Sequence, residues 1–91
     1  MQFARFLREG IRAGAITCTI RIWASPRVKV GGRYRLGEGE IEVTSIQLIS
    51  LAEITPELAR RSGFNDVADL LKLAKHGEGE QIYYIEFRYH E

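Results

Sequence analysis

The feature that most constrains the fold is a strictly alternating segment, residues 17–23, which reads T-C-T-I-R-I-W. Successive side chains of an extended strand point to opposite faces. Cys18, Ile20 and Ile22 therefore share one apolar face, which we expect to point into the core. The other face carries a hydroxyl, hydroxyl, guanidinium and indole series: Thr17, Thr19, Arg21 and Trp23.

This second face combines the groups that hold a nucleotide. Hydroxyls both donate and accept hydrogen bonds, a guanidinium fork fits phosphate or carboxylate, and an indole offers a flat ring for stacking. The same residue types are also common on solvated antiparallel strands. The segment alone is consistent with a nucleotide site or with an ordinary outer face.

Length and composition indicate one globular domain over residues 1–91. Hydrophobic residues make up 45% of the chain and charged residues 27%, which is ordinary for a domain with a single core. No apolar run approaches the roughly 20 residues of a membrane span, so we expect no membrane partner. The single cysteine, Cys18, rules out an internal disulfide and is expected to be a buried thiol in a cytoplasmic protein.

The two parts of the chain differ sharply in charge. Residues 1–36 contain eight basic residues and one acidic residue, whereas residues 37–91 contain five basic and eleven acidic residues. Such asymmetry favours an anionic ligand for the first part, Lys29 and Arg33 included. Pairing of the basic part with the acidic part across the fold is the alternative.

Hydrophobic periodicity predicts an N-terminal helix followed by strands. Phe3, Phe6, Leu7 and Ile11 form one amphipathic stripe, and Gly14 is placed to end the helix. The alternating strand follows to about Trp23, and a second strand is expected over residues 33–36.

A long strand over residues 40–51 changes the parity of its apolar positions. Ile41 and Val43 are odd, whereas Ile46 and Leu48 are even. A strand of period two changes parity only through a bulge or bend, which we expect near Thr44 and Ser45. Curved barrel strands bend in this way.

Two helices and a final strand complete the pattern. Thr55 is a good N-cap with Pro56 at the first helical position, and Asn65 or Asp66 begins another helix. The expected end of that helix is Lys75, His76 and Gly77. Residues 81–89 alternate aromatic and aliphatic side chains and predict a closing strand.

The order of these elements, with several local motifs, resembles the ASCH domains of the PUA-like superfamily. The motifs are G-A-I-T-C-T-I-R (14–21), V-K-V-G-G-R-Y-R-L (28–36), I-E-V-T-S-I (41–46), I-T-P-E-L-A-R-R-S-G-F (54–64) and I-E-F-R-Y (85–89). The resemblance covers nearly the whole chain. It implies an α+β fold, a small PUA-like mixed β-barrel flanked by about three helices.

The family signature G-x-K-x-x-E-x-R, with threonine replacing glutamate in some members, is only partly present. Gly14, Thr19 and Arg21 match, but Ile16 replaces the lysine. In small bacterial members that deacetylate acetylated cytidine, that lysine, the threonine and a glutamate form the catalytic set, and alignment places Ser62 at the glutamate. Thr19 is therefore the only retained catalytic candidate, and the resemblance does not imply deacetylation by this chain.

The sequence predicts neither a metal site nor a cofactor. It has two histidines, no C-x-x-C and no H-E-x-x-H motif. Glu38, Glu40 and Glu42 alternate along one strand face, where they suit a solvated edge or a weakly bound hard cation.

These observations lead to a binding module as the main prediction. In it, Thr17 and Thr19 contact the base or ribose of an RNA or modified nucleoside, and Trp23 stacks on a base. Phosphate contacts are expected from Arg21, Lys29 and Arg33. The alternative is a small hydrolase acting on nucleic acid, either a metal-dependent ribonuclease or a nucleoside amidohydrolase with a rewired site. An interaction domain without a nucleotide ligand is a third possibility.

Overall fold

The structure is a computed structural model that describes residues 2–75 and 79–91. Its elements follow in the order α1 (Arg5–Arg12), β1 (Cys18–Trp23), β2 (Arg33–Leu36), β3 (Gly39–Ile49), η1 (Leu51–Glu53), α2 (Pro56–Arg61), α3 (Val67–Ala74) and β4 (Gln81–His90). The α+β class is confirmed, and η1 is a short 3-10 helix that the patterns did not predict. No helix in the described ranges is long and apolar enough to cross a bilayer.

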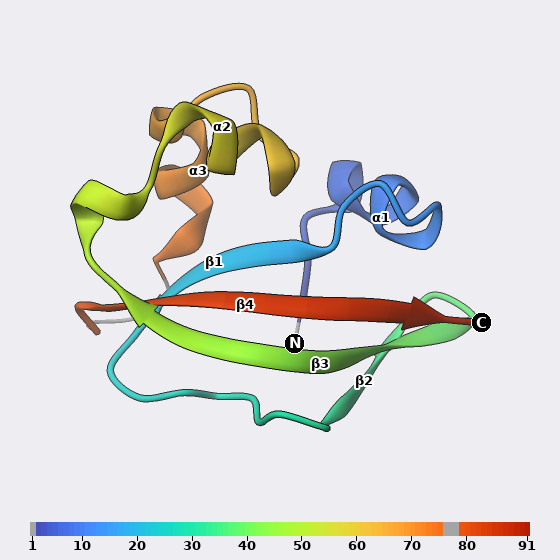
Figure 1. Cartoon of the computed structure of the whole chain (residues 1–91). Helices are drawn as coiled ribbons and strands as arrows, with labels where there is room; N and C mark the ends of the chain where they lie inside the picture. The colour runs from blue at the N-terminus through green and yellow to red at the C-terminus, as the bar shows by residue number, and fades with distance from the viewer. Residues whose placement is uncertain (1, 76–78) are drawn as a thin grey trace.

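The four strands form one curled sheet in the order β1-β4-β3-β2 (Figure 1). All three strand pairings are antiparallel, and the sheet covers about half of a barrel. It differs from the predicted mixed barrel because β4 returns antiparallel between β1 and β3. Within the described residues, parallel pairing is limited to a bridge between Ile22 and Lys75. β1 and β2 are thus the two edge strands.

β3 bends where the change of parity predicts a bend. Val43 lies opposite Phe87, but the pairing then shifts, so that Ser45 lies opposite Glu86. The extra residue in β3 moves the following side chains to the other parity, as a β-bulge does. Val43 and Ile46 consequently pack in the same cluster, and the predicted bulge is confirmed.

The two faces of the sheet are covered by different helices. The face that carries Val43, Ile85 and Phe87 packs partly against Leu7 of α1 and its neighbours. The opposite face, which carries Ile20, packs against α2 and α3. Figure 1 shows α1 and the α2–α3 pair standing apart beside β1. β1 therefore lies at the edge of the sheet that is nearest to the helices.

Both faces of β1 are buried, which corrects the prediction of one core face and one outer face. Cys18 and Ile20 are buried as expected, with exposed fractions of 1% and 3%. Arg21 and Trp23 are also buried, at 7% and 3%. Alternation marks the two faces of a strand but does not show how many of them are covered, and here helices or loops cover both. Burial also raises the pKa of the Cys18 thiol.

The N-terminal helix departs from its predicted stripe at one position. α1 ends at Arg12, and Gly14 follows with a φ of +80°, a backbone conformation that glycine adopts without strain. Phe3, Leu7 and Ile11 are buried, whereas Phe6 is 63% exposed. The prediction that Phe6 belongs to the core stripe is therefore wrong. The buried side of this segment is formed by Phe3, Leu7 and Ile11, which are spaced four residues apart.

The caps of α2 and α3 form as predicted. Thr55 Oγ1 accepts a hydrogen bond from the Leu58 backbone N–H at 3.1 Å, with Pro56 at the first helical position. Asp66 caps α3 by accepting from the Asp69 backbone N–H at 2.8 Å. α3 ends at Ala74 with Lys75 as its C-cap. The predictions for His76 and Gly77 lie outside the described residues.

Candidate functional site

A cavity of about 250 Å³ lies at the free edge of β1. It is bounded by the N-terminal segment and α1 on one side and by Phe64 and the end of α3 on the other. We call this cavity the β1 pocket, and its lining consists of Gln2, Phe3, Ala4, Leu7, Thr19, Ile20, Arg21, Phe64, Leu73 and Ala74. Two residues of the predicted site, Thr19 and Arg21, are among these.

Arg21 is the charged group of the β1 pocket. Its Nη2 donates to the Gln2 carbonyl oxygen at 2.6 Å, and its Nε donates to Thr19 Oγ1 at 3.2 Å. The guanidinium carbon lies 4.8 Å from the centre of the Phe3 ring, a cation–π distance. Burial lowers the pKa of Arg21 to about 10, which leaves the guanidinium protonated at neutral pH. The pocket therefore contains a fixed positive charge.

Thr19 is held beside this charge by the register of β1. It lies opposite Ile85 of β4 and is 6% exposed. Its hydroxyl oxygen accepts from Arg21 and keeps its own hydrogen for donation. Arg21 and Thr19 share one face because they are two residues apart in a strand.

The peptide groups of Ile20 are directed toward the pocket side of β1. The Phe87 backbone N–H donates to the Thr17 carbonyl oxygen at 2.9 Å, which marks Thr17 and Phe87 as a hydrogen-bonded pair. Hydrogen-bonded pairs alternate with non-hydrogen-bonded pairs in an antiparallel ladder. Thr19 and Arg21 consequently bond toward β4, and the N–H and carbonyl of Ile20 point away from it. The pocket is thus bordered by a strand edge that can pair with a planar ligand.

The other predicted binding residues lie elsewhere. Thr17 is exposed just before β1 and does not line the pocket. Trp23 is buried against Tyr83, with ring centroids 6.1 Å apart, so the indole belongs to the core and has no open face for a base. Lys29 and Arg33 belong to the β2 end of the sheet, separated from β1 by β4 and β3. Local sequence did not reveal this separation, because β1 and β2 are close in sequence but β4, from the C-terminal end of the chain, and β3 lie between them in the sheet.

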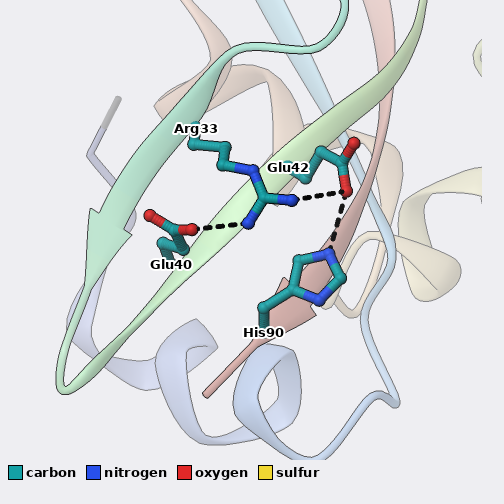
Figure 2. A network of polar contacts seen from close by, with 4 residues as sticks. All are labelled: Arg33, Glu40, Glu42 and His90. Atoms are coloured by element: carbon teal, nitrogen blue, oxygen red, sulfur yellow. Dashed lines mark hydrogen bonds and ion pairs between the residues drawn. The ribbon is translucent and has the colours of Figure 1, made fainter.

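Arg33 instead belongs to a polar network with Glu40, Glu42 and His90 (Figure 2). Its Nη1 lies 2.6 Å from Glu40 Oε1, and its Nη2 lies 3.7 Å from Glu42 Oε1. His90 Nε2 is 2.9 Å from the same Glu42 oxygen. The hydrogen bond with His90, followed by the charge of Arg33, holds the pKa of Glu42 below its usual value. Two of the alternating glutamates are therefore partners of Arg33 on an exposed surface.

Pairing between the basic and the acidic part of the chain occurs at Arg33. Arg33 pairs with Glu40 and Glu42, which both belong to the acidic part of the chain. Arg5, Arg8, Arg12 and Lys29 are exposed. Internal pairing therefore accounts for Arg33, whereas these four side chains lie at the surface.

Ile16 and Ser62 are the residues that the resemblance places at two catalytic positions. A Cβ added at Gly63 would lie 2.8 Å from Ile16 Cδ1, so the Ile16 side chain packs against the residue after Ser62. Ser62 is 2% exposed, and its hydroxyl donates to the carbonyls of Leu58 and Ala59, each at 3.0 Å. Neither residue supplies a base for Thr19.

The sequence patterns missed the aromatic and N-terminal walls of the β1 pocket. Phe3 precedes the first helical residue, and Phe64 lies in the loop between α2 and α3. The Phe3 signal was its place in the apolar stripe, but a stripe predicts burial and not a pocket wall. Phe64 follows Gly63, whose φ of +98° turns the chain back, and no periodic signal marks it.

Within residues 2–75 and 79–91, no group of three or more histidine, cysteine or acidic side chains is arranged to hold a metal ion. Comparison with protein-family models, curated proteins and solved structures finds no match to this chain. The pocket's own chemistry must therefore support any assignment of function.

Proposed function

We propose that this chain is an ASCH-type, PUA-like domain that binds RNA or a modified nucleoside in the β1 pocket. The observation that carries the proposal is the convergence of Thr19, Arg21 and the outward peptide edge of Ile20 on one cavity with aromatic walls. A planar base needs edge hydrogen bonds and ring contacts, and a phosphate needs a cation.

Each group has a defined task in this proposal. The hydroxyl of Thr19 and the peptide groups of Ile20 bond to the edge of the base. The planar fork of Arg21 contacts phosphate or an electronegative base edge. Phe3 and Phe64 contact the apolar faces of the ligand, as aromatic side chains do in single-strand sites.

The size of the β1 pocket favours one base at a time. Its volume of about 250 Å³ is just below the roughly 300–1,000 Å³ of ordinary small-molecule pockets. A single nucleobase suits such a cavity, whereas a stacked duplex does not.

Binding without turnover fits the surroundings of Thr19 better than hydrolysis does. A nucleophilic threonine needs an adjacent general base. The Thr19 hydroxyl oxygen accepts a hydrogen bond from the Arg21 guanidinium, a donor that cannot take a proton from it. The hydrolase alternative thus requires a base supplied from outside the pocket or by the ligand.

A titration of nucleosides by calorimetry tests the proposal. The panel contains the four ordinary ribonucleosides, their 5′-monophosphates and acetylated cytidine. We expect at least one to bind, and Thr19→Val, which keeps the shape but removes the hydroxyl, to weaken it several-fold. Thr44→Val, at an exposed position on β3, is the matched control and should leave affinity unchanged. Absence of binding across the panel, and to short single-stranded RNA at low salt, would refute the proposal.

A further inference from the structure

Phe6 is an exposed aromatic residue next to the β1 pocket. It lies on α1 and is 63% exposed, although its neighbours Phe3 and Leu7 are buried. Its ring meets that of Phe64 edge to face, with centroids 5.8 Å apart and planes at 82°. Phe64 in turn lines the β1 pocket. The two rings therefore extend the aromatic wall of the pocket onto the surface.

A second cavity, of about 370 Å³, is lined by both rings of this pair. Its walls include Phe6, Phe64, Asn65, Lys72 and Leu73. Phe64 and Leu73 are shared with the β1 pocket, so the two cavities are neighbours.

We propose that the second cavity binds the neighbouring nucleotide of a single-stranded RNA whose first base occupies the β1 pocket. This inference rests on the proposed function and names its ligand class as a strand of at least two nucleotides. The neighbouring base stacks on Phe6, and Lys72 and Asn65 lie within the same cavity to contact phosphate or base edges. Base–aromatic stacking tolerates any base, so this second position binds without strong sequence preference.

Charge near the second cavity favours a polyanion over a protein partner. Arg5 and Arg8 are exposed on the helix that carries Phe6. The acidic wall residue, Asp69, lies 3.7 Å from Lys72 and is partly neutralised by it. The large apolar side chains exposed at this cavity are Phe6 and Leu73, a small patch compared with the apolar groove that a partner helix needs.

The test compares nucleoside 5′-monophosphates with the dinucleotides ApA, CpC, GpG and UpU. We expect a dinucleotide to bind at least several-fold more tightly than its monophosphate. Phe6→Ala should remove that gain, weakening dinucleotide binding roughly 5- to 150-fold on the scale of base–aromatic stacking, and leave the monophosphate affinity unchanged. Leu48→Ala, which truncates a similarly exposed apolar residue on β3, is the control and should alter neither affinity.

The outcomes separate this inference from the proposed function. Dinucleotides that bind no more tightly than monophosphates, with no effect of Phe6→Ala, would overturn the second position and leave the β1 pocket intact. Loss of all nucleotide binding by the wild-type protein would refute both. Concentration-dependent self-association abolished by Phe6→Ala, without a change in dinucleotide affinity, would reassign the patch to contact between copies. Because Phe6 is exposed, the variant is expected to fold, which circular dichroism checks.

Discussion

The two edges of the sheet each carry an arginine, and the two guanidinium groups lie in different surroundings. At the β1 edge, Arg21 is 7% exposed and contacts a hydroxyl, a carbonyl oxygen and an aromatic ring. At the β2 edge, Arg33 lies on the surface between two carboxylates (Figure 2). Burial of a guanidinium carries a desolvation cost that surface pairing avoids. Arg21 borders the β1 pocket, whereas Arg33 does not, so Arg21 is the better candidate for ligand recognition.

This contrast also shows why only one of the two arginines predicted to bind phosphate lies at the β1 pocket. The alternating segment and the basic part of the chain both predicted contacts to an anion. Of the predicted residues, however, only Thr19 and Arg21 line the β1 pocket. Strand order decides the outcome, because β4 and β3 separate Arg33 from Arg21. Substitutions at the two edges test this contrast, and the largest effect is expected at Trp23.

Replacing Trp23 tests whether this end of β1 is core or binding surface. Trp23→Ala should destabilise the protein by about 3–5 kcal/mol, the usual cost of truncating a buried tryptophan. Denaturant titration measures this loss. Trp23→Phe should retain nucleotide affinity, since the ring packs on Tyr83. A large loss of affinity in a well-folded Trp23→Phe protein would restore the predicted stacking role.

Replacing each arginine by methionine compares the contributions of the two edges to nucleotide binding directly. Arg21→Met should weaken nucleotide binding roughly 10- to 100-fold, because hydrogen bonds to a charged group contribute about 1.5–3 kcal/mol. Arg33→Met, the matched substitution at the β2 edge, should leave affinity and the thermal midpoint nearly unchanged. Calorimetry with the tightest-binding nucleotide gives both values. Equal losses in the two variants would show that the edges do not differ in function.

The network around Glu42 should give the β2 edge a weak acid dependence. The pKa of Glu42 is lowered in the folded state, so its contribution to stability is complete above its ordinary pKa of 4.5 and is lost as pH falls through the folded value. Glu42→Gln should therefore flatten the fall in thermal midpoint between about pH 5 and pH 3. Glu38→Gln, at an exposed position outside the network, serves as the control. An unchanged slope in Glu42→Gln would contradict the role of this network.

The last prediction concerns catalysis, and we expect no deacetylase activity. Ile16 cannot polarise a carbonyl or accept a proton, and Ser62 donates its hydroxyl to helix carbonyls. The purified protein should not deacetylate acetylated cytidine in an assay that follows acetate release. Turnover that disappears in Thr19→Ala would overturn this expectation and reveal a base supplied by another element.

Local patterns predicted most of the elements because their signals are local. The bulge after Val43, the Thr55 cap and the end of α1 before Gly14 each depend on a few neighbouring residues. The site depended on distant contacts instead. Burial of Arg21 follows from the Gln2–Phe3 segment folding over β1, and no periodic signal places a segment that precedes a helix.

Phe6 also shows that local patterns do not determine which residues are buried. An apolar residue at helical spacing predicts burial, but the structure exposes it next to Phe64. Spacing shows which residues share a helix face and does not give the width of the surface against which that face packs.

Amide chemical-shift mapping tests the central claim, that the β1 edge and not the β2 edge binds the nucleotide. The uniformly ¹⁵N-labelled protein is titrated with the tightest-binding nucleotide, and shifts at Thr19, Ile20 and Arg21 are compared with those at Arg33 and Arg35. We predict saturable shifts centred on the β1 residues and on Phe64, with little change along β2. Shifts centred on β2, or none at saturating nucleotide, would contradict the assignment of the β1 pocket.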